Sequence, residues 1–218
     1  MPTTFLLGVD IGQQVDYTAL ALVERTQAGP SHPHDDGVYP VPEAPPPAQY
    51  TVRHLQRLDL HTRYPVIVER LCAMLTRPAS SGRVTVLLDV TGVGRGILDM
   101  FSSARVRCIA VTMHGGFTTT QHGLEWHVPK KELVFRLASL AQARPVRLAL
   151  GDRLPFAAAV RHEMASFTAR INPATASESF AAWREQDHDD LIISLAMCAW
   201  WGETLGNRRP ALAIPYGH

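Results

Sequence analysis

Cysteine is scarce in this sequence, with three residues among 218: Cys72, Cys108 and Cys198. They are far apart and odd in number, and none belongs to a CxxC motif, which argues against a zinc site or a disulfide framework. Two of the three lie in apolar segments. The sequence therefore predicts buried, reduced thiols in a cytosolic protein.

A large excess of one charge is also missing, because the formal net charge is +1. The chain lacks the strongly basic composition typical of many nucleic-acid-binding domains, so any surface that binds DNA is expected to be local. Lysine occurs only as Lys130 and Lys131, and the other basic residues are arginines. Arginine can bind phosphate through two hydrogen bonds at once, so the composition is compatible with a phosphate-containing ligand.

The sequence shows no membrane-spanning segment, no signal peptide and no P-loop. Residues 191–201 form the longest strongly apolar run, which is too short to span a bilayer, so no membrane partner is expected. The N-terminal residues MPTTFLL lack the basic and long apolar regions of a signal peptide. No G-x-x-x-x-G-K-[ST] motif occurs, so no P-loop ATPase domain is predicted.

The apolar content, 46% of 218 residues, is sufficient for one globular domain, predicted over residues 1–218. Residues 28–49 are rich in proline and are predicted to form a surface loop, and residues 206–218 a polar tail. No internal repeat and no clear boundary divides the chain.

The order of apolar segments predicts an α/β fold, with a central mixed β-sheet flanked by helices on both faces. The predicted strands span residues 5–10, 17–24, 50–59, 84–89 and 106–111, and the predicted helices span residues 65–77, 97–102, 129–143, 154–167 and 189–205. Residues 112–128 are predicted to be loop-like, and residues 167–183 to contain one or two short strands.

Four aspartates stand at the edges of these apolar segments. Asp10 and Asp89 end two predicted buried strands, and Asp189 and Asp190 open the last helix. Acids are costly to bury unless they are paired or bind a metal, and carboxylates that meet repel one another. A divalent cation such as Mg²⁺ or Mn²⁺ relieves that repulsion. Any one of these acids alone is better explained as a turn or helix cap, but the combination favours a metal site.

Four segments carry a family resemblance in a fixed order: GVDIG, LLDVTGVGRGILDMF, VPKKELVFRLASLA and HDDLIISLAMCAWW. Together they resemble the nuclease domain of the large terminase subunit of tailed phages, from about residue 5 to residue 203. This resemblance implies a ribonuclease-H-like fold and an endonuclease that cuts concatemeric viral DNA during genome packaging with two Mg²⁺ or Mn²⁺ ions. It also implies double-stranded DNA as substrate, in the cytoplasm of a bacterial host.

By that resemblance Asp10, Asp89 and one or both of Asp189 and Asp190 are metal ligands. Asp10, Asp89 and Asp190 are then also catalytic, with His188 near the metals as a proton-handling or supporting group. An unpaired surface histidine is the equally common explanation of His188.

Three basic residues are candidates for contact with DNA phosphates. Lys130 and Lys131 match a basic position before the family's long helix, and they oppose the dipole of that helix. Arg95 lies in the glycine-rich turn after Asp89, whose G-x-G-x-G spacing does not match a dinucleotide-binding loop. Solvent-exposed lysines and an ordinary surface arginine are the simpler explanations.

Family partners implied by the resemblance are a terminase ATPase domain, the small terminase subunit and the portal. Two other functions stay open. One is a sugar-kinase- or actin-like nucleotide-binding protein, whose first strand also ends in D-x-G. The other is a non-catalytic DNA-binding relative of the nuclease.

Overall fold

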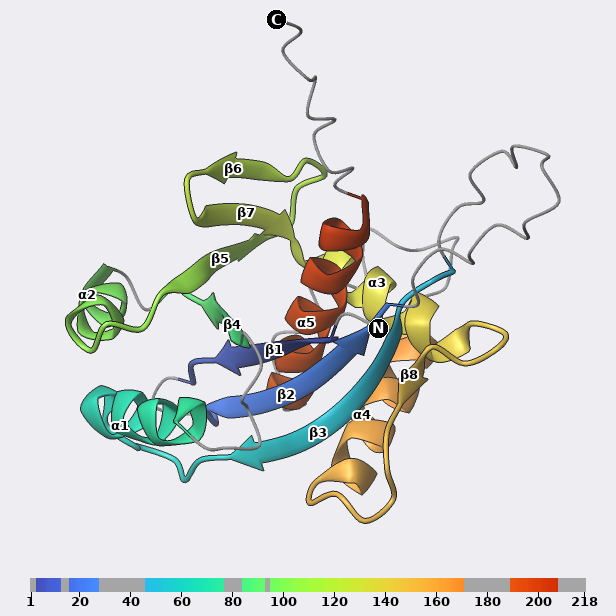
Figure 1. Ribbon diagram of the computed structural model, residues 1–218, viewed down its shortest axis with the longest axis horizontal. Helices are drawn as coiled ribbons and strands as arrows, with labels where there is room; N and C mark the ends of the chain where they lie inside the picture. Colours follow the sequence, from blue (N-terminus) through green and yellow to red (C-terminus); the bar gives the residue numbers. More distant parts are fainter. Residues whose placement is uncertain are drawn as a thin grey trace, which may run out of the picture.

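The computed structural model describes residues 3–12, 16–27, 46–76, 84–92, 95–170 and 189–207 (Figure 1). The strands are β1 Thr3–Asp10, β2 Ala19–Thr26, β3 Gln49–Arg57, β4 Val84–Asp89, β5 Cys108–His114, β6 Thr120–His122, β7 Glu125–Pro129 and β8 Leu148–Ala149. The helices are α1 Tyr64–Leu75, α2 Arg95–Ser103, α3 Lys130–Gln142, α4 Ala157–Arg170 and α5 Asp190–Asn207.

The strands form one eight-stranded mixed sheet in the order β6-β7-β5-β4-β1-β2-β3-β8. β1, β4, β5 and β7 are mutually parallel, and β2 is antiparallel to both β1 and β3. β3 therefore runs parallel to β1. The carboxyl ends of β1, β3, β4 and β5 consequently lie at the same edge of the sheet. The run β3-β2-β1-β4-β5, with β2 reversed, forms the centre of the sheet.

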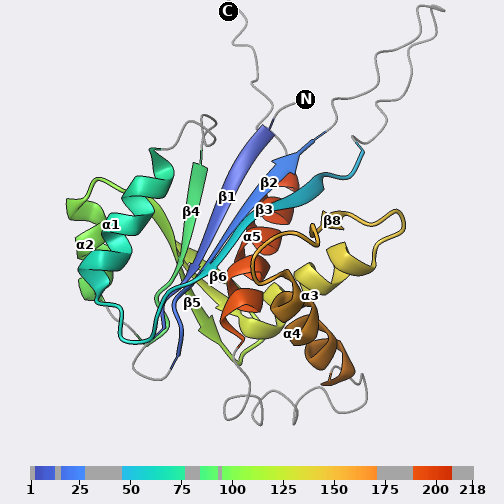
Figure 2. The ribbon, with the colours of Figure 1, turned by 90° about the horizontal axis from the view of Figure 1, so that it is seen from below.

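Helices cover both faces of the sheet, as predicted, with α1 and α2 on one face and α3, α4 and α5 on the other (Figure 2). The inner strand β1 shows why its sequence is apolar throughout. Leu6 packs in the core beneath α5, whereas Leu7 and Val9 pack in the core beneath α1 and α2. Side chains alternate between the two faces of a strand, so the middle of a strand covered on both sides, residues 6–9 of β1, is buried throughout.

α5 packs directly against β1. At Gly8 a β-carbon would collide with the backbone oxygen of Ser194, so glycine is required for this close approach. Trp200 and Trp201 at the far end of α5 pack edge-on against Trp126 of β7, with ring centroids 5.3 and 5.8 Å away. These tryptophans are core residues. Among the described helices, none has the length and apolarity that crossing a membrane requires.

The predicted loop over residues 112–128 was wrong. Its first residues complete β5, and β6 and β7 form a hairpin that turns at Gly123, whose φ is 64°. In β7 Trp126, Val128 and Pro129 are buried and Glu125 and His127 are exposed, whereas every residue of β6 is exposed. The alternation was therefore too short to be recognised. These strands form because they pair with β5, not because of a strong local preference.

Two further differences concern short elements. β8 has two residues and no periodic pattern, and it was missed. Residues 167–170, where short strands were predicted to begin, belong to the end of α4. The rest of that predicted segment, residues 171–183, lies outside the described residues.

Candidate active site

Asp10 and Asp89 meet at the edge of the sheet where the parallel strands end. Val9 of β1 is paired in register with Leu88 of β4, so Asp10 and Asp89, the last residues of the two strands, lie at the same level. The two carboxyl groups hydrogen-bond to one another. Two carboxyl groups in hydrogen-bond contact require a shared proton or a cation, because two negative charges in contact repel strongly.

Burial disfavours the charged form of both Asp10 and Asp89. The pKa of Asp10 is raised well above the ordinary value, first by burial and then by the negative charges of Asp89, Asp189 and Asp190. Burial also raises the pKa of Asp89, although hydrogen bonds from Thr91 and the positive charge of Lys130 act in the opposite direction. All four candidate acids are therefore close enough to influence one another.

The turn after β4 holds the carboxylate of Asp89 in place. Asp89 Oδ1 accepts a hydrogen bond from the backbone N–H of Thr91 at 2.8 Å, and Thr91 Oγ1 accepts one from the N–H of Met113 at 2.8 Å. Gly92 follows with a φ of 78°, which glycine adopts without strain. The D-x-T-G pattern thus has a local function: it ties the acid at the end of β4 to the neighbouring strand β5.

Asp190, the first residue of α5, is buried against an arginine that sequence reasoning missed. Arg57, the last residue of β3, donates to both oxygens of Asp190, at 2.6 Å from Nε and 3.0 Å from Nη2. The same Nη2 donates to Glu163 Oε1 of α4 at 2.6 Å. Glu163 Oε2 in turn accepts the N–H of Ile192 at 3.2 Å. This network joins β3, α4 and α5.

Asp189 precedes α5 and has a different partner. Its Oδ2 accepts a hydrogen bond from Lys130 Nζ at 2.7 Å. Lys130 is the first residue of α3, directly after β7, and therefore lies at the same sheet edge as Asp10 and Asp89. The backbone oxygen of Asp189 accepts the N–H of Ile193, so Asp189 caps the helix as well. The basic position predicted to contact DNA thus binds a candidate metal ligand.

The other predicted site residues are Lys131, Arg95 and His188. Lys131 lies over the ring of Phe117, 3.2 Å from its centroid. Arg95 begins α2, but its side chain is outside what the structure describes, and so is His188. Across the described part of the chain, no three His, Cys, Asp or Glu side chains are grouped as a metal-binding set. The reason is visible in the contacts, since Lys130 and Arg57 hold Asp189 and Asp190.

The residues present nevertheless fit a hard divalent cation. The donors are carboxylate oxygens, which Mg²⁺ and Mn²⁺ prefer. The raised pKa of Asp10, caused in part by three neighbouring acids, marks a surplus of negative charge that a cation would neutralise. Asp10 and Asp89 provide the hydrogen-bonded pair, and Asp189 and Asp190 lie within electrostatic reach.

Arg57 and Glu163 carried weak sequence signals. Arg57 ends a partly alternating strand, and Glu163 lies in the middle of a helix. Each residue type is common on solvated surfaces in such positions. Only the parallel orientation of β3 and β1, which brings Arg57 to the acidic edge, would have singled it out.

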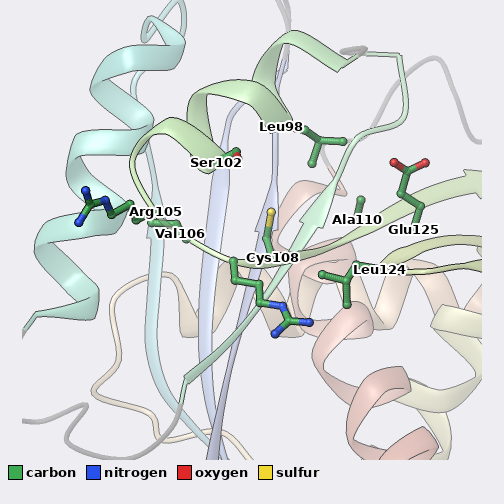
Figure 3. Close-up of a pocket in the computed structure, with 9 residues that line it drawn as sticks. Leu98, Ser102, Arg105, Val106, Cys108, Ala110, Leu124 and Glu125 are labelled. Carbon is green, nitrogen blue, oxygen red and sulfur yellow. The ribbon is translucent and has the colours of Figure 1, made fainter.

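A cavity of about 350 Å³ lies away from these acids, between α2 and the sheet. Figure 3 shows Leu98 and Ser102 of α2 facing Cys108 and Ala110, which are in the amino-terminal half of β5. None of the four candidate aspartates lines it. The candidate site therefore depends on the carboxyl ends of the strands and not on this cavity.

Comparison with known proteins yields similarities of fold. No protein-family model matches the sequence, and no curated protein matches it. The structure is similar to two crystal structures of the large terminase nuclease from thermophilic phage G20c. One has bound zinc, with 17% identity, 89% of this chain and 79% of that chain covered, and a TM-score of 0.49. The other has 16% identity, 89% and 80% coverage, and a TM-score of 0.47. At these values the similarity concerns the fold alone, and function has to be argued from the site.

Proposed function

We propose that this chain is a metal-dependent endonuclease that cleaves phosphodiester bonds of double-stranded DNA. The observation that supports this most is the hydrogen-bonded carboxyl pair of Asp10 and Asp89, with Asp189 and Asp190 close enough to raise the pKa of Asp10. A surplus of carboxylates at one edge of a sheet is costly without a cation. The order of the sequence motifs around these acids, which resembles that of terminase nucleases, supports the same conclusion.

Asp10, Asp89 and at least one of Asp189 and Asp190 would hold the cations. When bound, Mg²⁺ or Mn²⁺ ions supply stabilisation of the negative charge that develops on a phosphodiester during hydrolysis, through a two-metal mechanism. The chain's own groups position the ligands: Thr91 fixes Asp89, and the start of α5 carries the third carboxylate. His188, by the resemblance, would handle a proton there.

DNA would be bound mainly through its phosphates. Lys130, Lys131 and Arg95 are the proposed basic contacts, so affinity for DNA should fall steeply with salt and depend little on sequence. In this proposal the biological setting is genome packaging in the host cytoplasm, with an ATPase domain, a small terminase subunit and the portal as partners.

Cleavage of supercoiled plasmid tests the proposal. Wild-type protein and the Asp10→Asn variant are compared in Mn²⁺, Mg²⁺ and EDTA, with Asp99→Asn as the matched control because Asp99 is an exposed acid on α2. We expect nicking and linearisation that EDTA and Asp10→Asn abolish and that Asp99→Asn leaves intact. Retained DNA binding without cleavage under any metal would instead favour a non-catalytic relative, and binding of ATP without cleavage a nucleotide-binding protein.

A further inference from the structure

The two neighbouring acids at the start of α5 are held in unequal ways. Asp190 has 5% of its side chain exposed, and both of its oxygens accept hydrogen bonds from Arg57. Asp189 has 28% exposed and one ion pair, to Lys130, which is itself 29% exposed. Identical carboxylates one residue apart thus differ in burial, in the number of bonds and in the kind of partner.

Asp190 is fixed from several directions. The planar guanidinium of Arg57 matches a carboxylate at two points, which makes such a pair geometrically strict. Arg57 is only 17% exposed and is also paired with Glu163, which is 10% exposed. Withdrawing Asp190 from this network would leave a buried arginine with one partner fewer, and a buried charge without its partner is strongly unfavourable.

Asp189 is held by a bond that exchanges easily. Lysine carries its charge on a long flexible chain, and an ion pair that water still reaches on both groups is weaker than a fully buried one. Asp189 therefore has a single, more exposed partner, whereas Asp190 is held at two points by a buried guanidinium. The Lys130 ammonium already occupies the position of a positive charge next to Asp189 and lowers the pKa of Asp89.

We propose that Asp189 is the carboxylate that passes from Lys130 to the divalent cation, while Asp190 stays bound to Arg57 as a fixed anchor of α5. This inference rests on the proposed function, because it assumes a cation at the Asp10–Asp89 pair. Lys130 is then a positioning residue that balances the charge of the metal-free site. Once released, its ammonium lies at the same sheet edge, where it can pair with a DNA phosphate.

Metal binding without DNA tests the exchange independently of cleavage. Isothermal titration of the full chain with Mn²⁺ compares wild type with Asp189→Asn, Asp190→Asn and Lys130→Met. Asp189→Asn should weaken binding more than about tenfold, as expected for loss of a ligand. Asp190→Asn should leave Mn²⁺ affinity within a few-fold while lowering thermal stability, because it disrupts the network around Arg57.

Lys130→Met supplies the second measurement, which does not disturb Asp190. Removing the competing ammonium should tighten Mn²⁺ binding by roughly two- to fivefold, the range of a half-exposed ion pair. Lys131→Met is the matched control, since it removes the same charge from the next residue, which lies over Phe117 instead. Equal tightening by both variants would mean a general charge effect and would overturn the exchange.

The outcomes separate the two proposals. Wild-type protein that binds no Mn²⁺ and cuts no DNA would overturn the proposed function and the exchange together. Wild-type protein that binds Mn²⁺ and cleaves, but whose affinity is lost in Asp190→Asn and kept in Asp189→Asn, would overturn the exchange alone. If Asp190→Asn fails to fold by circular dichroism, the comparison of the two lysine variants decides.

Discussion

The two ends of α5 differ in the ratio of acidic to basic groups around them. At its carboxyl end Glu203 accepts hydrogen bonds from Tyr50 at 2.7 Å and from Arg147 at 2.7 Å, beneath the packed rings of Trp200 and Trp201. One carboxylate there meets one guanidinium and one hydroxyl. The polar groups are satisfied within the protein, as expected of a structural network.

At the amino end of α5, acids outnumber the bases that contact them. The carboxyl groups gathered there belong to Asp10, Asp89, Glu163, Asp189 and Asp190. Within the described part of the chain, their basic contacts are Arg57 and Lys130. Burial raises the pKa of Glu163 to about 7, although Arg57 lowers it. The comparison shows that both ends contain ion pairs, whereas among the described residues the surplus of carboxyl groups is at the amino end, where the proposed metal site lies.

The largest expected effect comes from neutralising the acidic end. Asp89→Asn should reduce metal-dependent cleavage at least about a thousandfold, since metal ligation supplies several kcal/mol of charge stabilisation. Because Asn still accepts the Thr91 N–H and removes one repelling charge, the metal-free variant should melt at or above the wild-type temperature. Plasmid cleavage and differential scanning calorimetry measure the two. Cleavage at the wild-type rate would show that the site is wrong.

A pair of arginine variants compares the two ends directly. Arg57→Gln should cost about 3–5 kcal/mol of unfolding free energy in urea, the usual cost of stranding buried charges. Arg147→Gln should destabilise the other end without changing Mn²⁺ binding. Arg53→Gln is the control on β3, because its pair with Glu24 is half exposed and worth less than about 1 kcal/mol. Equal losses for Arg53 and Arg57 would contradict the buried network.

The smallest expected effect concerns the chemical labelling of Cys198, where α5 packs against β1. Cys198 contacts the backbone oxygens of Leu6 and Ala21 at 3.6 and 3.7 Å, and burial raises its pKa to about 12. At pH 8 its thiol is protonated and enclosed, so alkylation by iodoacetamide should wait for α5 to detach from β1. Mass spectrometry of the labelled peptide with and without urea gives the measurement. Rapid labelling of native Cys198 would show that this end opens as readily as a surface loop.

Much of the fold could be predicted from local sequence. The strands ending at Asp10 and Asp89 and the helix beginning at Asp190 are strongly apolar. The length of such an apolar run decides whether it forms a buried strand or a buried helix. Their order predicted the mixed sheet with two helical layers. The hairpin of β6 and β7 and the two-residue β8 were missed, because pairing with neighbouring strands decides them.

The sequence by itself determined which acids stand at strand and helix ends, because a charged residue closing an apolar run is a local pattern. Only the tertiary structure decided their partners. Arg57 lies 133 residues from Asp190 and 106 from Glu163, and Lys130 lies 59 from Asp189. Local periodicity carries no information about pairs at such separations. They form because parallel strands bring their carboxyl ends to one edge, where opposite charges meet.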